Sequence, residues 1–221
     1  MRIRSRILDI HPVTQDVKCF RIEKPQGYSF TPGQATDVSI NQQGLEEELR
    51  PFTYTALNEK PYLEFTIKRY ADRHGVTDKL HQLVPGDELL IGEPWGAISY
   101  QGPGYFIAGG AGITPFISIL RKLHKDGQVK GNTLIFSNKT SADIIYEKEL
   151  VDILGDRAIF ILTKEEKQGY TNDRIDANYI RKNITDLTKH FYICGPDQMI
   201  SDISGILHAA GVSPDTVVFE K

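Results

Sequence analysis

The sequence has few cysteines, no long hydrophobic run and little net charge. Its two cysteines, Cys19 and Cys194, lie far apart, which excludes a disulfide framework or a four-cysteine iron–sulfur cluster within this sequence. The arginine-rich start is not followed by an apolar segment of the kind found in secretory signals or membrane spans. We therefore expect a cytoplasmic protein without a membrane span.

The small net charge also limits the classes of partner. Lys and Arg number 26 against 29 Asp and Glu, a net charge of -3 without a dense basic block, so nucleic acid is not an expected partner. The six histidines have no zinc-ligand spacing, and no metal site is expected. The 221 residues, 40% of them hydrophobic, are typical of a globular protein. We take a monomer as the default.

The two halves of the chain have different patterns. Before residue 101, short β-branched or alternating segments are separated by Pro- and Gly-rich turns, which indicates an antiparallel barrel or sandwich. After residue 104, strand-like and helix-like segments alternate, which indicates a parallel α/β sheet. The predicted strands are 2–10, 17–23, 36–40, 52–57, 63–69, 88–91, 105–108, 133–137, 158–163, 191–194 and 216–219; the predicted helices are 116–125, 147–154, 178–183 and 198–210.

A glycine-rich turn follows the first strand of the second half. Gly110 and Gly112 carry no side chains, so the backbone can approach a pyrophosphate or a nicotinamide closely. Thr114 suits a helix N-cap and Pro115 the first helical position. The turn predicts a nucleotide site, although glycines at such places also serve close helix–strand packing.

Two segments of the first half have residues that suit a ligand with phosphate groups and a flat ring. In a strand, Arg50 and Phe52 share one face and Thr53 points to the other, a set that suits a ligand with a phosphate and a flat ring. Further on, Thr77 can cap a short helix whose amides face an anion, and Gly75 allows close approach.

Together these motifs resemble the ferredoxin-NADP reductase superfamily, in particular its small stand-alone flavodoxin-reductase-like members. The resemblance covers nearly the whole chain, and its weight comes from five motifs in the family's order. Residues 50–53 match Arg-x-Tyr-Ser/Thr, 74–77 match Gly-x-Ser/Thr after His74, 92–98 resemble Gly-Pro-x-Gly-x-Phe, 110–115 match Gly-x-Gly-x-x-Pro and 192–199 match Cys-Gly-Pro-x-x-Met.

The resemblance implies a flavin-binding Greek-key barrel over residues 1–101 and an NAD(P)-binding α/β domain over residues 102–221. It favours FAD over FMN as the cofactor. Arg50 would pair with the flavin phosphates, Phe52 would stack on the isoalloxazine ring, and Thr53 would hydrogen-bond near its N5. Because the family usually has tyrosine where Phe52 stands, we expect weaker flavin retention. The remaining flavin-side residues are Pro51, Lys68, Gly75, Val76 and Thr77, the last three holding the pyrophosphate.

On the nicotinamide side, the resemblance gives Cys194 a place beside the path of hydride transfer, where it would position the nicotinamide. Without the motif, a lone cysteine at a strand end is usually a small buried hydrophobe. We expect Thr53 and Cys194 to touch the reacting groups. The residues expected to bind NADPH or NADH are Gly110, Gly112, Ile113, Thr114, Pro115, Cys194, Gly195, Pro196 and Met199.

The implied function is hydride transfer from NAD(P)H to bound FAD, then single-electron transfer to a protein acceptor such as flavodoxin or ferredoxin. One alternative is a reductase of free flavin, a quinone or an oxygenase partner. Another is a flavin-binding relay subunit without independent turnover. NADPH is slightly favoured over NADH by basic residues after the second and third strands of the second half: Lys139, Lys164, Lys167 and Arg174.

Overall fold

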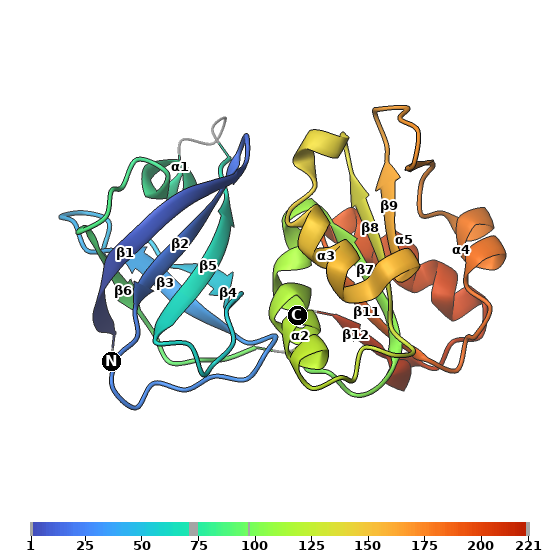
Figure 1. Ribbon diagram of the computed structural model, residues 1–221, viewed down its shortest axis with the longest axis horizontal. Coiled ribbons are helices and arrows are strands. Elements are labelled where there is room, and N and C mark those ends of the chain that lie inside the picture. Colours follow the sequence, from blue (N-terminus) through green and yellow to red (C-terminus); the bar gives the residue numbers. More distant parts are fainter. Residues whose placement is uncertain (1, 71–74, 97, 220–221) are drawn as a thin grey trace. The chain divides into compact units, whose positions relative to one another are not determined.

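The computed structural model of the chain describes residues 2–70, 75–96 and 98–219, which fold as two units. One unit contains Met1–Gly96 together with Thr114–Lys122, and the other contains Ala97–Ile113 together with Leu123–Lys221. Figure 1 shows an antiparallel sheet in the first and a parallel sheet flanked by helices in the second. The predicted fold class is confirmed, and the domain boundary at residues 101 and 102 stays a prediction.

The antiparallel sheet of the first unit is closed into a barrel. Its strand order in the described residues is β4-β3-β6-β1-β2-β5, and an antiparallel bridge between Tyr54 and Phe65 joins the two outer strands. Closure removes the unpaired edges that an open sheet would expose. The strands are β1 (Ile3–Thr14), β2 (Val17–Glu23), β3 (Ala35–Ile40), β4 (Arg50–Thr53), β5 (Tyr62–Lys68) and β6 (Glu88–Ile91).

Inward-facing residues at every second position fill this barrel, as the strand period of two requires. Phe20 and Ile22 on β2 and Leu63 and Phe65 on β5 are fully buried and belong to one apolar cluster. The short helix α1 (Val76–Leu80) adds Val76 to the same cluster.

The end of β4 differs from the predicted strand over residues 52–57. Thr53 pairs with Ala35 of β3, but the amide of Thr55 already donates to the carbonyl of Glu64 on β5 over 2.9 Å. The chain therefore changes partners at Tyr54, and this change ends β4 and closes the barrel.

The second unit is built on a parallel sheet with the order β10-β9-β8-β7-β11-β12 in the described residues. Strand order reverses between β7 and β11, the kind of position at which doubly wound sheets bind ligands. The strands are β7 (Gly104–Gly109), β8 (Thr133–Asn138), β9 (Ala158–Leu162), β10 (Thr171–Asn172), β11 (His190–Cys194) and β12 (Val217–Phe219); the helices are α2 (Thr114–Lys125), α3 (Glu147–Leu154), α4 (Ala177–Asn183) and α5 (Asp197–Ala209).

Helices α4 and α5 pack on one face of this sheet. Tyr179 of α4 and Ile203 of α5 share a buried cluster with Ile107, Ile135 and Ile193 from the strands, while Figure 1 shows α3 on the opposite face. No helix in the described ranges is long and apolar enough to cross a membrane.

Helix α2 begins at the glycine-rich turn, and its first nine residues, Thr114–Lys122, belong to the first unit. The amide of Gly33 donates to Ser118 Oγ over 3.1 Å, and Arg121 Nη1 donates to the carbonyl of Thr55 over 2.7 Å. The predicted apolar residues of the helix are all buried: Phe116, Ile119, Leu120 and Leu123.

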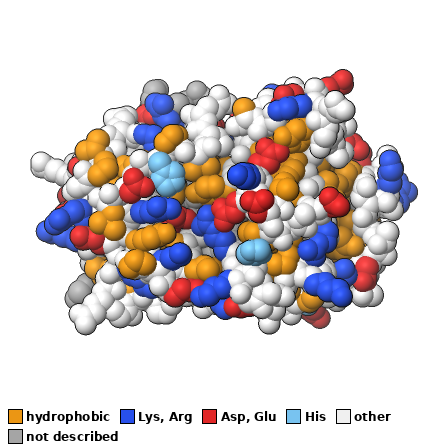
Figure 2. All heavy atoms as spheres, in the orientation of Figure 1, with side chains coloured by type: hydrophobic (Ala, Val, Ile, Leu, Met, Phe, Trp, Pro, Cys, Tyr) orange, Lys and Arg blue, Asp and Glu red, His pale blue; other side chains and the backbone are white. Residues whose placement is uncertain are grey.

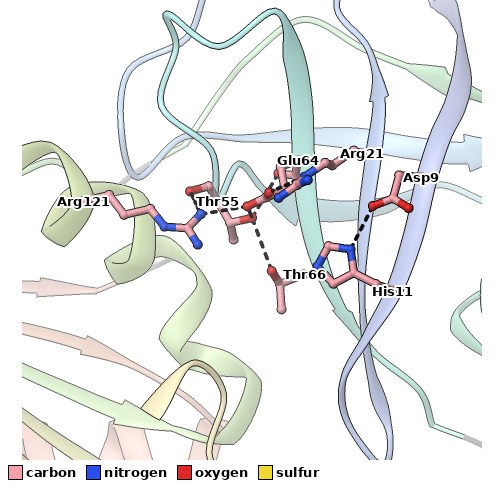
Figure 3. Close-up of polar contacts among 7 residues, drawn as sticks. All are labelled: Asp9, His11, Arg21, Thr55, Glu64, Thr66 and Arg121. Atoms are coloured by element: carbon pink, nitrogen blue, oxygen red, sulfur yellow. Dashed lines mark hydrogen bonds and ion pairs between the residues drawn. The ribbon is translucent and has the colours of Figure 1, made fainter. Parts of the chain in front are cut away.

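Arg121 also reaches a buried carboxylate on β5, which Figure 3 shows. Glu64 Oε1 lies 2.7 Å from Arg121 Nη1 and Oε2 lies 3.0 Å from Arg21 Nε. Thr55 Oγ1 donates to Glu64 Oε1 over 3.0 Å. The Glu64 side chain is only 4% exposed, so these partners replace the water that its charge would otherwise need.

Candidate functional site

The ends of β7 and β11 meet so closely that glycine is required between them. A Cβ atom added to Gly112 would lie 2.3 Å from the carbonyl oxygen of Cys194 and 2.6 Å from the amide nitrogen of Gly195. These contacts are with backbone, which cannot rotate away. The structure therefore brings the predicted glycine turn and the predicted Cys-Gly-Pro segment together at the reversal point of the sheet.

Gly109 takes part in the same close approach, and the sequence analysis did not include it in the site. Its added Cβ would lie 2.5 Å from Met199 Sδ and 3.0 Å from Pro196 Cδ. Gly195 lies equally near, since its Cβ would be 3.2 Å from the amide nitrogen of Gly109. The doubled glycine directly after a buried strand is the sequence signal that could have identified this position.

Gly110 serves a different purpose from its neighbours. Its φ is +53°, in the left-handed region that side chains disfavour, and a Cβ placed there would meet nothing within 4 Å. A side chain at Gly110 would therefore enter open space. Gly110 thus fits a backbone that a pyrophosphate approaches, whereas Gly112 fits close packing of the chain on itself.

The helical segment after the turn begins earlier than predicted. A 3₁₀ turn over Gly110–Ile113 leads directly into α2 at Thr114, so the predictions of Thr114 as N-cap and Pro115 as first helical residue are wrong. The reason is that glycines 110 and 112 allow helical turns four residues before the Thr-Pro signal. Ile113 and Pro115 are buried, which leaves backbone groups as their contribution to a ligand.

In the first unit, the start of α1 also differs from the prediction. Gly75 is the N-cap without a side-chain cap, and Thr77 is the second helical residue, so the prediction of Thr77 as the cap is wrong. Val76 points into the barrel core, and only its amide can face a ligand. The first amides of such a helix have no acceptor within the helix. His74 lies outside the described residues.

The four residues of β4 run from exposed to buried. Arg50 is exposed, with Nη1 donating to the carbonyl of Leu49 over 2.6 Å and Nη2 3.7 Å from Glu48 Oε2. Pro51 is exposed, Phe52 is half-buried with its ring 6.4 Å from that of Phe65, and Thr53 is buried. The strand thus presents a guanidinium and part of an aromatic ring to its surroundings.

Two further parts of the predicted motif set are Lys68 and the segment over residues 92–98. Lys68 Nζ lies 3.0 Å from Asp16 Oδ2, so this cation already has a protein partner. The segment 92–98 includes Ala97, which lies outside the described residues. Within that segment, Gly96 has φ +144° and a Cβ there would lie 3.1 Å from Gln34 Cα. Backbone conformation and close packing therefore explain why a glycine stands at this position.

The residues present fit a dinucleotide in the second unit. Gly110 has a left-handed backbone with open space beside it, and the neighbouring glycines 109 and 112 pack against the Cys194–Met199 segment without room for a Cβ. In the first unit, the exposed Arg50 guanidinium suits phosphate and the half-buried Phe52 suits a flat ring. The first unit therefore suits a flavin, and the second suits a nucleotide.

Comparison with known proteins agrees with this division. Residues 5–100 match the family described as an oxidoreductase FAD-binding domain, and residues 106–205 match the oxidoreductase NAD-binding domain. The fold is similar to that of a ferredoxin NADP+ reductase from Neisseria gonorrhoeae crystallised with FAD and NADP. The TM-score is 0.86 at 20% identity, covering 99% of this chain and 98% of that one.

Curated relatives are longer than this chain. The reductase component of propane 2-monooxygenase from Rhodococcus jostii is 27% identical over 236 residues, which cover 99% of this chain and 63% of the relative. NADH-cytochrome b5 reductase 2 from Mycosarcoma maydis is 29% identical over 226 residues, covering 92% of this chain and 64% of the relative. Because the two family models match both halves of the chain in order, the chain belongs to the ferredoxin-NADP reductase superfamily, with an FAD-binding barrel and an NAD-binding α/β unit.

Proposed function

We propose that the chain is an NAD(P)H-dependent flavoprotein reductase that passes electrons singly to a protein acceptor. The observation that carries this proposal is the meeting of the turn at Gly110–Gly112 with the Cys194–Pro196 segment, with open space beside the backbone of Gly110. When bound, FAD supplies the chemistry, since a flavin takes up two electrons together and releases them one at a time.

The chain's own residues bind and orient in this proposal, and none needs to act as a strong acid or base. Arg50 pairs with the flavin phosphates and Phe52 lies against the ring. Thr53 holds a hydrogen bond near the reacting edge of the ring. On the nucleotide side, the 3₁₀ turn after Gly110 receives the diphosphate, and Cys194 limits where the nicotinamide can lie.

The acceptor we favour is a small redox protein such as flavodoxin or ferredoxin. The relatives' names favour a second candidate, a reductase for an oxygenase system, since one is the reductase component of propane 2-monooxygenase and another that of a naphthalene 1,2-dioxygenase system. On the described part of the face in Figure 2, acidic and basic side chains are interspersed, so we propose docking by local complementarity. A cytoplasmic location and a monomer stay predictions from the sequence.

The test is the visible absorption of the purified protein, followed by anaerobic addition of NADPH and, separately, NADH. A bound flavin that bleaches with either nucleotide supports the reductase. A colourless protein that neither binds added flavin nor oxidises either nucleotide would overturn it.

The same preparation tests the relay alternative. Steady reduction of an artificial acceptor by the isolated chain would exclude a subunit without independent turnover. Flavin that bleaches once, with no continued turnover after the acceptor is added, would favour the relay instead.

A further inference from the structure

The segments that follow β8 and β9 lie side by side at the carboxyl edge of the parallel sheet. The amide of Thr163 donates to the carbonyl of Asn138, and that of Lys164 donates to the carbonyl of Lys139, each over 2.9 Å. Strand β8 is the neighbour of β7 on the side away from β11. In doubly wound sheets, a dinucleotide that starts at the reversal point extends its adenosine half over this next strand.

The donor groups of the segment after β8 are bonded to the protein's own carboxylates. The amide of Ser141 donates to Glu165 Oε2 over 2.5 Å. The amide and the hydroxyl of Thr140 donate to Asp143 Oδ2 over 2.9 and 2.7 Å. A phosphate bound here would need such donors, and it would meet two negative charges that already use them.

The Glu165 carboxylate is charged at neutral pH, and its hydrogen bonds with Ser141 and the nearby charge of Lys167 lower its pKa further. Lys167 lies nearby, but its Nζ donates to Ser141 Oγ over 2.9 Å and stands 5.3 Å from the centre of the Tyr170 ring. The Lys167 ammonium is thus engaged by the Ser141 hydroxyl and the Tyr170 ring, while the Ser141 amide is bonded to the Glu165 carboxylate.

A buried neutral amide stands at the same strand end. Asn138 is 5% exposed, and within the described residues its Nδ2 and Oδ1 have no hydrogen-bond partner. An unpartnered buried amide needs a donor and an acceptor. A ribose hydroxyl can be both, whereas a phosphate dianion accepts only.

We propose that Glu165 makes NADH the preferred electron donor, by holding a carboxylate on the Ser141 amide where the 2′-phosphate of NADPH would have to bind. This inference rests on the proposed reductase function and names its substrate. It replaces the slight preference for NADPH that the basic residues of these segments suggested. The structure shows that the carboxylates of Asp143 and Glu165 occupy the hydrogen-bond donors of Thr140 and Ser141.

The decisive variant is Glu165→Gln, which keeps the shape of the side chain and removes its charge. Its matched control is Glu166→Gln, since Glu166 is the adjacent exposed acid. Calorimetry with 5′-ADP and 2′,5′-ADP measures the adenosine side without turnover. We expect the wild type to bind 5′-ADP about tenfold more tightly, Glu165→Gln to remove most of that difference, and Glu166→Gln to preserve it.

Anaerobic flavin reduction by each nucleotide gives the second readout, as the ratio of kcat/KM for NADH to that for NADPH. A wild type that prefers NADPH, equal shifts in the two variants, or no binding of either ADP would overturn the inference. If the flavin-loaded wild type is reduced by neither nucleotide but still discriminates the two ADPs through Glu165, the proposed reductase function fails and the adenosine site stands.

Discussion

Arg121 Nη1 on helix α2 lies 2.7 Å from Glu64 Oε1 on strand β5, so a helix that follows the glycine turn is fixed to the barrel by a buried ion pair. Glu64→Gln would leave Arg121 and Arg21 without their anion. Because both guanidiniums are partly exposed, we expect the lower range for breaking a buried pair, about 3 kcal/mol. Urea unfolding measures this loss. Glu23→Gln, on the exposed end of β2, is the control and should stay within about 0.5 kcal/mol of the wild type.

The same pair predicts a pH dependence of stability. Burial raises the pKa of Glu64, but the charge of Arg121 and hydrogen bonds from Arg121, Arg21 and Thr55 outweigh burial, so the net pKa is lowered from 4.5. The Glu64 carboxylate therefore binds a proton more readily in the unfolded state than in the folded state. The contribution to stability is complete above about pH 4.5 and is lost as the pH falls through the lowered value. Unfolding the wild type and Glu64→Gln at several acidic pH values should show their difference narrowing; a constant difference would count against the pair.

The variant Gly110→Ala tests whether Gly110 lies against the nucleotide or only permits the backbone conformation of the turn. Gly110 and Gly127 both have positive φ, and neither would bring a Cβ within 4 Å of another atom, so alanine at either should cost about 1 kcal/mol of stability. Only Gly110→Ala should also weaken NAD(P)H binding, by about tenfold, because its methyl group would enter the space where we propose that the nucleotide binds. Nucleotide titration with both variants checks this, and equal affinities would show that the turn is merely structural.

Phe52→Tyr should strengthen flavin retention. Phe52 is half-buried at the barrel surface, and a hydroxyl added to the ring would supply the contact that the family's usual tyrosine makes. We expect a gain of several-fold, in line with one added hydrogen bond of about 1 kcal/mol. Quenching of free flavin fluorescence by the apoprotein measures the dissociation constant. An unchanged constant would mean that the ring at this position contributes by stacking alone.

Cys194→Ala tests whether this thiol positions the nicotinamide. Cys194 and Cys19 are both buried, so alanine at either should lower stability to a similar extent. We expect only Cys194→Ala to slow flavin reduction at saturating nucleotide. If both variants reduce flavin at the wild-type rate, Cys194 is a packing residue.

The elements that the sequence predicted well are those whose signal is local. Strand β2 and helix α3 have the predicted bounds, and the apolar spacing of α2 predicted its buried face. The 3₁₀ turn at Gly110 was missed because Thr114 and Pro115 form a stronger local signal. The Glu64–Arg121 and Ser141–Glu165 contacts join residues 57 and 24 positions apart, and no periodicity or motif in the chain encodes such pairs.

The division of the chain between its units has a consequence for recombination. Because the first nine residues of α2 belong with the barrel, a cut after residue 101 would not yield two self-sufficient pieces. The barrel fragment would keep Glu64 but lose Arg121 and Ser118. A chimera that exchanges the nucleotide half for that of a relative should therefore succeed only when the incoming helix carries a cation and a hydroxyl at these two positions.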